Sequence, residues 1–457
     1  MKRITSYLVV TLAVLGFLFS GGERGGAFTL KEAVEFGIAH NPALRGVKKG
    51  VEVKEEEVGI ATSYHLPRVT LSSRYVKTDS PADVFGLKLN RQELAAADFA
   101  GIPDSFNNPP SYDTYVSTLE VQVPLFVPKV LAGRGVAKKD FEAERETFLR
   151  EAEKLARGVV KAFVGVLTAK GYLTAAESAL ADAREHLKIA EKMVEVGTGL
   201  QSDVLRASVF LSRAEEGKVR ASNGLAVAKE ALKVAMGSDE DVSVEGGFSL
   251  DDEVKPLDYY VGEALKRRRD LVALRKRVEM AKRGVRYEQA DYLPSVAAFG
   301  QVEVNGSSSP FDDDADAYRV GVALSWDLFD GLGRERRVRK AKKRAEQVRD
   351  FLASMENTVR FEVKRAYLEL ESAKARWEIA KNALKSAEEG VRLIRGRYEN
   401  SLARMVELLD AQSALDAARA DEVKARNDYY LALADLYAAS GLLLEKLDVT
   451  IPGEVEE

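Results

Sequence analysis

The sequence contains one unit written twice, and this duplication constrains the fold more than any other feature. A shift of 227 residues places Leu66-Pro67 on Leu293-Pro294, together with the apolar residues that precede each pair. A shift of 204 residues aligns the long apolar series that begin at Val159 and Val363. A repeat of this kind dictates the architecture. We therefore expect a repeat at 28–240, a linker at 241–256, a second repeat at 257–441 and a tail at 442–457.

Composition excludes several classes of function. The 457 residues include no cysteine, which removes disulfides, thiolate nucleophiles and cysteine-ligated metals. His40, His65 and His186 lack the spacing of a histidine metal site. The net charge of -4 gives no reason to expect nucleic acid as a partner. Because no catalytic constellation or nucleotide loop is found, we predict no enzymatic activity, no metal and no cofactor.

The N-terminus has the pattern of an export signal. Met1-Lys2-Arg3 precedes a 13-residue apolar run, Tyr7 to Phe19, and small residues follow up to Ala27. This order is typical of a secretory signal peptide, which we place at 1–27, with an anchor helix as the alternative. No later stretch is continuously apolar for 18 residues. Any membrane crossing is therefore expected to be a β-barrel or absent.

Each repeat is predicted to contain a helix and then two amphipathic strands. The first helix is expected from Leu30 to about Ser63, with Thr29 as its N-cap. Residues with alternating polarity follow, and the length of each run suits a tilted membrane strand, although a soluble antiparallel sheet is the alternative. The strands are expected at about 68–76, 115–126, 295–305 and 317–328. Aromatic residues near the strand ends form a candidate interfacial girdle or, alternatively, core caps: Tyr64, Phe126, Tyr292, Trp326 and Phe329.

The remainder of each repeat is predicted to be a long helical hairpin. From Val338 to Tyr398 apolar residues recur at alternating steps of three and four, with one extra step of four at Val359–Val363. This spacing predicts a coiled-coil seam with one stutter. Ser202 is the expected N-cap of the first returning helix. The hairpins are expected at 131–237 and 334–441.

The ordered set of these features resembles the TolC family of outer-membrane efflux channels, over nearly the whole mature chain. The resemblance is carried by short motifs at the repeat starts, the strand–helix junctions and the hairpin tips. These are Asn41-Pro42-Ala43-Leu44, the two Leu-Pro pairs, Val123-Pro124-Leu125-Phe126, Trp326-Asp327-Leu328-Phe329-Asp330-Gly331, Ser202-Asp203-Val204-Leu205-Arg206-Ala207 and Val406-Glu407-Leu408-Leu409-Asp410-Ala411.

The resemblance implies an α+β, mainly α fold and a homotrimer. Four strands per protomer would form a 12-stranded transmembrane β-barrel that continues into a periplasmic α-helical barrel. The implied function is the exit duct of a tripartite efflux or type I secretion system. Its expected partners are a periplasmic adaptor, an inner-membrane pump and the lipid of the outer membrane, without a lipid anchor on cysteine. A soluble periplasmic coiled-coil adaptor or structural protein is the alternative.

The resemblance also assigns roles at the hairpin tips. Ser202, Asp203 and Tyr398 match residues of the family's periplasmic gate. The gate arginine of the family aligns with Ala403, so Arg404 is expected to replace it. Glu407 and Asp410 match the carboxylates of the entrance selectivity ring, and their i, i+3 spacing places them on one helix face. A solvated acidic helix face is the alternative for this pair.

Overall fold

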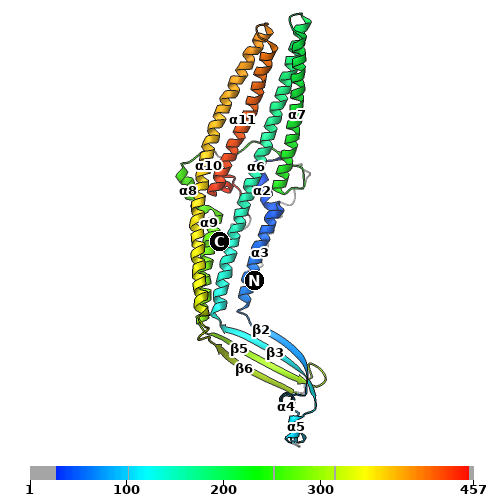
Figure 1. Cartoon of the computed structure of the whole chain (residues 1–457), viewed down its shortest axis with the longest axis vertical. Helices are drawn as coiled ribbons and strands as arrows, with labels where there is room; N and C mark the ends of the chain where they lie inside the picture. The colour runs from blue at the N-terminus through cyan, green and yellow to red at the C-terminus, as the bar shows by residue number, and fades with distance from the viewer. Residues whose placement is uncertain (1–26, 101, 251–252, 313–314, 452–457) are drawn as a thin grey trace, which may run out of the picture. The chain divides into compact units, whose positions relative to one another are not determined.

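The computed structural model describes residues 27–100, 102–250, 253–312 and 315–451 (Figure 1). The expected signal peptide lies outside the described residues, apart from Ala27. The chain divides into two compact units, which are described separately. Unit 1 comprises residues 1–49, 146–272 and 353–457, and unit 2 comprises residues 50–145 and 273–352.

Unit 2 contains a four-stranded antiparallel sheet in the order β2-β3-β5-β6. The strands are β2 (Arg68–Thr78), β3 (Tyr112–Phe126), β5 (Ser295–Gly306) and β6 (Ala315–Ser325). Between β2 and β3 lie α4 (Pro81–Asn90), η1 (Ala96–Phe99) and α5 (Asp104–Asn107). The edge strands β2 and β6 each pair with one strand among the described residues.

The two faces of the sheet differ in polarity. Cross-strand pairs share a face, and one row runs Leu71, Leu119, Val302 and Tyr318. The adjacent row, on the opposite face, runs Thr70, Glu120, Gln301 and Arg319. Along β6 the large apolar side chains, Tyr318, Val320, Val322 and Leu324, are between 65% and 76% exposed. A large exposed apolar face is uncommon on a soluble protein and indicates contact with lipid or protein.

Long helices complete both units. Unit 1 receives parts of α6 (Pro128–Glu195) and α10 (Gly333–Glu399), and it contains the helices that return from them, α7 (Gln201–Met236) and α11 (Met405–Ser440). The shorter elements are β1 (Ala27–Phe28), α2 (Leu30–His40), β4 (Ser243–Val244), α8 (Leu257–Arg267) and α12 (Leu443–Lys446). Helices α3 (Pro42–Ser63) and α9 (Arg269–Gln289) have residues in both units, and η2 (Ala290–Tyr292) precedes β5.

Helix ends follow local chemistry. The Thr29 prediction is confirmed, because its side chain accepts from the Glu32 backbone while the Glu32 side chain accepts from the Thr29 backbone. Gly237 and Gly441 end the two returning helices in the left-handed conformation, with φ of 68° and 72°. Val359 and Val363, which flank the predicted stutter, are both fully buried inside unit 1.

Several boundaries differ from the prediction. The first helix is broken at Asn41, whose extended backbone precedes Pro42, because proline disfavours a helical conformation in the residue before it. Ser202 is not the N-cap of α7; Leu200 takes that position without a side-chain bond. Helix α6 begins at Pro128 rather than at 131, with proline at its first position. Strand β6 ends at Ser325, so Trp326 lies beyond it.

One helix bears on the expectation about membrane crossing. Among the described residues, α6 contains a stretch that is long and apolar enough by composition to cross a membrane. The apolar side chains Val159, Phe163 and Val164 are fully buried within unit 1. Their packing against neighbouring helices accounts for this part of the apolar composition, and 28% of the stretch is buried.

Candidate functional site at the hairpin tips

The turn between α6 and α7 is built on two glycines. Gly197 has a φ of 78°, and the backbone amides of Thr198 and Gly199 both donate to the Met193 carbonyl, at 2.9 and 2.8 Å. A Cβ on Gly199 would approach the Met193 carbonyl carbon to 2.8 Å. Glycine is therefore required at this position for the chain to turn so tightly.

The turn between α10 and α11 reaches a similar geometry with other residues. Ser401 takes the left-handed conformation, with a φ of 60°. The Leu402 amide donates to the Arg397 carbonyl at 2.7 Å, and Asn400 Nδ2 donates to the Gly396 carbonyl at 2.7 Å. Arg404 is the N-cap of α11 by its backbone.

A small apolar core joins the two hairpin tips within unit 1. Its buried members come from all four helices: Ala190, Ala207, Tyr398, Met405 and Leu408. Leu187, Met193, Val204 and Ile394 pack around them. The two tips therefore share one core within the protomer.

The predicted gate residues lie in or beside this core and differ in how deeply they are buried. The Tyr398 ring is 3% exposed, and burial together with the nearby Asp203 carboxylate raises its pKa. No hydrogen bond joins Tyr398 to Asp203 in the part of the chain that the structure describes. Ser202 is exposed on the first turn of α7. The side chain of Arg404 is 80% exposed and is not part of the core.

The two predicted ring residues lie at the start of α11. Arg404 Nε donates to Glu407 Oε1 at 3.1 Å, and this hydrogen bond lowers the Glu407 pKa. Asp410 is exposed one turn later. Glu407 lies in the first turn of α11, near the positive end of the helix dipole.

The predicted girdle residues are all exposed to some degree. The exposed fractions range from 39% for Tyr292 to 77% for Phe329. Trp326 Nε1 donates to the Tyr292 carbonyl at 3.1 Å, and the Arg334 guanidinium lies 4.4 Å from the centre of the Tyr292 ring. These contacts hold Trp326 and Tyr292 just beyond the end of β6.

The sequence did not predict a buried polar network that lies between α6 and α11, a few turns from the hairpin tips. His186 on α6 is 2% exposed, and its Nε2 lies 3.1 Å from Gln412 Oε1 on α11. Gln412 Nε2 donates to Asp182 at 3.0 Å and to Asp416 at 2.9 Å. Arg419 pairs with Asp182 at 2.7 Å. The available sequence signal was a glutamine between the apolar residues Leu408 and Leu415, about one turn to either side.

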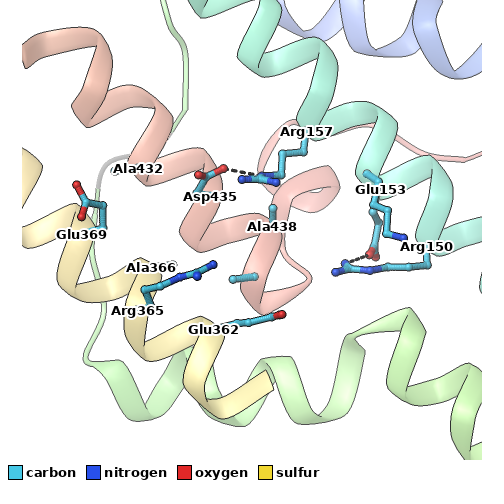
Figure 2. Close-up of a pocket in the computed structure, with 12 residues that line it drawn as sticks. Arg150, Glu153, Arg157, Glu362, Arg365, Ala366, Glu369, Ala432, Asp435 and Ala438 are labelled. Carbon is cyan, nitrogen blue, oxygen red and sulfur yellow. Dashed lines mark hydrogen bonds and ion pairs between the residues drawn. The ribbon is translucent and has the colours of Figure 1, made fainter. Parts of the chain in front are cut away.

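A second polar cluster surrounds a cavity of about 430 Å³ within unit 1, between α6, α10 and α11 (Figure 2). Arg157 Nε lies 2.6 Å from Asp435, and Arg150 Nη1 lies 2.8 Å from Glu153. Burial raises the Glu153 pKa, although Arg150 opposes this shift. Four cations and four carboxylates line the cavity, so neither charge is in excess. The ion pair between Arg157 and Asp435 connects α6 to α11 across it.

The sequence matches a known family in two segments. The model of the outer membrane efflux protein family matches residues 37–238 and residues 260–442. The chain belongs to this family. It is an outer-membrane protein with a periplasmic extension, and it serves as an exit duct for efflux or secretion. The soluble adaptor alternative is not favoured by this match.

Individual relatives agree with this assignment. The chain is 25% identical to the alkaline protease secretion protein AprF of Pseudomonas aeruginosa, over 97% of this chain and 90% of that protein. Its fold is similar to that of CusC, with a TM-score of 0.76 and 16% identity over 90% and 92% of the two chains. VceC of Vibrio cholerae gives a TM-score of 0.73 and 19% identity over 90% and 96%.

Proposed function

We propose that three copies of this chain form the duct, as a passive homotrimeric channel without catalytic activity. Each copy would supply four strands to one 12-stranded barrel. The family works with adaptor and pump proteins in tripartite systems. We propose that this chain likewise receives its cargo through a periplasmic adaptor and an inner-membrane pump. The proposed boundaries of its repeats and linker are those predicted from the sequence.

The observation that carries the proposal is the open four-stranded sheet. Its outer strands β2 and β6 have unpaired edges among the described residues, and one face is apolar and exposed. An open sheet edge does not occur in lipid, because unpaired backbone groups cost several kcal/mol each. Pairing β2 of one copy with β6 of the next satisfies both edges and closes a barrel.

The hairpin helices carry a second set of unpartnered surfaces. In the view of Figure 1, α7 and α10 are the outer helices of the four. Exposed apolar residues on α7 fall within about 80° of one another at 100° per residue, and those on the part of α10 that belongs to unit 1 within about 40°. These stripes are Leu205, Val209, Val219, Val227 and Val234 on α7, and Phe361, Leu368, Ile379 and Leu393 on α10. Each lies opposite its helix's buried side, which favours packing between copies.

We further propose that the tips form the entrance. Glu407 and Asp410 of three copies would give six carboxylates in one ring, which favours cations and binds multivalent ones. Ser202, Asp203, Tyr398 and Arg404 would hold the closed state. Because Tyr398 is buried, its contribution would be to position Asp203 and α11, while the exposed Arg404 is free to reach a neighbouring copy.

Single-channel recording in planar lipid bilayers tests the entrance ring. The double variant Glu407→Ala/Asp410→Ala should lose most of its cation selectivity, because six negative charges leave the constriction. Block by a trivalent cation such as hexaamminecobalt should weaken by at least about tenfold. Reversal potentials in a salt gradient measure the first effect, and blocker titration measures the second.

A matched control separates the ring from the general acidity of the surface. Glu371→Ala/Glu388→Ala removes two exposed carboxylates from α10 and should leave selectivity and block unchanged. If both double variants behave alike, or if Glu407→Ala/Asp410→Ala retains parental selectivity, the ring assignment is wrong. The exposed acidic helix face would then be the correct interpretation.

A further inference from the structure

A groove of about 490 Å³ lies within unit 2, where β3 ends and α6 begins beside α9. One side is apolar: Phe126, Leu131 and Leu293 line it and are between 43% and 57% exposed. The other side is basic, because Arg283 and Arg286 line it from α9. The groove therefore combines an apolar wall with two adjacent cations.

The groove continues the apolar face of the sheet. Phe126 pairs with Val296, and Val296 pairs with Leu324, so the three side chains lie on the same face. This is the face on which the exposed apolar residues of β6 lie. In an outer-membrane protein such a face contacts lipid. Phe126 thus belongs both to the lipid-facing surface and to the wall of the groove.

The two arginines have no protein partner among the described residues. Neither Arg283 nor Arg286 makes a hydrogen bond or an ion pair with any residue that the structure describes. By contrast, Lys129 nearby is neutralised by Asp291 at 2.9 Å. The Arg283 guanidinium lies against Gly135 on α6, where a Cβ would approach its Nη1 to 2.9 Å. The cations therefore remain available to a ligand outside the protein.

The two arginines lie one helical turn apart near the end of α9. Arg286 and Arg283 precede the end of α9 at Gln289 by three and six residues, or about 4.5 and 9 Å at 1.5 Å per residue. The headgroup layer on each side of a bilayer is about 5 to 8 Å thick. Arg286 lies within that distance of the helix end and Arg283 just beyond it, and arginine binds phosphate through paired hydrogen bonds.

We propose that this groove binds an anionic phospholipid of the periplasm-facing leaflet. Its phosphate would lie between Arg283 and Arg286, and an acyl chain would cover Phe126, Leu131 and Leu293. The proposal rests on the outer-membrane location of the chain and is independent of the gate and ring at the hairpin tips.

Fluorescence quenching by brominated lipids tests the proposal on the full-length protein. The chain has two tryptophans, and Trp377→Phe leaves Trp326, which is hydrogen-bonded to the backbone beside Leu293, as the reporter. Brominated phosphatidylglycerol should quench Trp326 more strongly than brominated phosphatidylcholine. The preference should be about fivefold or more, and Arg283→Gln/Arg286→Gln should reduce it to about one.

The control removes the same charge from another groove. Lys340 and Arg344 line a separate groove in unit 2, of about 780 Å³, and Lys340→Gln/Arg344→Gln should retain the parental preference. An equal loss in both variants would mean a diffuse basic surface, and no loss in Arg283→Gln/Arg286→Gln would mean no site; either result overturns the proposal. Displacement by millimolar glycerol 1-phosphate would also overturn it, in favour of a site for soluble phosphates. Single-channel conductance of Arg283→Gln/Arg286→Gln should be unchanged, which separates this outcome from a failure of the proposed duct.

Discussion

At the hairpin tip, the charge of Glu407 depends on its neighbour Arg404. The hydrogen bond from Arg404 lowers the Glu407 pKa, so the carboxylate stays charged to a lower pH than an isolated one. In Arg404→Ala the pKa should rise, and cation selectivity should then be lost at a higher pH as the solution is acidified. Reversal potentials recorded across a series of acidic pH values measure the midpoint. Arg392→Ala, which removes the ion pair with Glu389 instead, should leave the midpoint in place; an unshifted midpoint in Arg404→Ala would contradict the assignment.

A second single residue, the buried Gln412, joins the two hairpins. Gln412 is 1% exposed and bonds to His186, Asp182 and Asp416. Gln412→Leu leaves these polar groups without their partner, which should lower the free energy of unfolding by about 1–3 kcal/mol. Thermal unfolding followed by far-UV circular dichroism should show a reduced midpoint. Ser413→Ala, at the next and exposed position, should change the midpoint little; equal midpoints for both variants would refute a stabilising role.

Among the secondary-structure elements, Gly224 inside α7 and Gly237, which follows its last residue, differ in whether they tolerate a side chain. Gly237 has a φ of 68°, and a Cβ there would approach the Asn41 Cα to 2.8 Å, whereas a Cβ on Gly224 meets nothing within 4 Å. Gly237→Ala should therefore destabilise unit 1 by more than about 1 kcal/mol. Gly224→Ala should stabilise the helix by about 0.5–1 kcal/mol. Thermal midpoints of the two variants should move in opposite directions, and a shared direction would contradict this account of the α7 terminus.

The elements that sequence reasoning located have local causes. Thr29 caps α2, Gly237 and Gly441 end the returning helices, and each uses chemistry contained within a few residues. The Gln412–His186 contact joins residues 226 positions apart, so only helix packing reveals it. The Asn41-Pro42 pair indicates the break between α2 and α3. The apolar periodicity continues across this pair, however, and it predicts a single helix. At the candidate site, sequence similarity placed the tip residues, whereas the burial of Tyr398 and the Arg404–Glu407 bond required coordinates.

For the whole molecule, the exposed apolar stripes predict how copies associate. Val219 on α7 is 70% exposed on the side opposite the buried Ala207 and Leu232. In the proposed homotrimer this stripe is covered by a neighbouring copy, so Val219→Lys would bury an unpaired charge, at a cost of several kcal/mol. Ser222→Lys adds the same charge at an exposed position of the same helix, about 60° farther round from the stripe at 100° per residue. Val219→Lys should abolish the heat-resistant trimer on gels or lower the temperature at which it dissociates, while Ser222→Lys should preserve it. If Val219→Lys trimers are as heat-resistant as those of the parent, the stripe lies outside the contact between copies and the proposed packing of α7 is wrong.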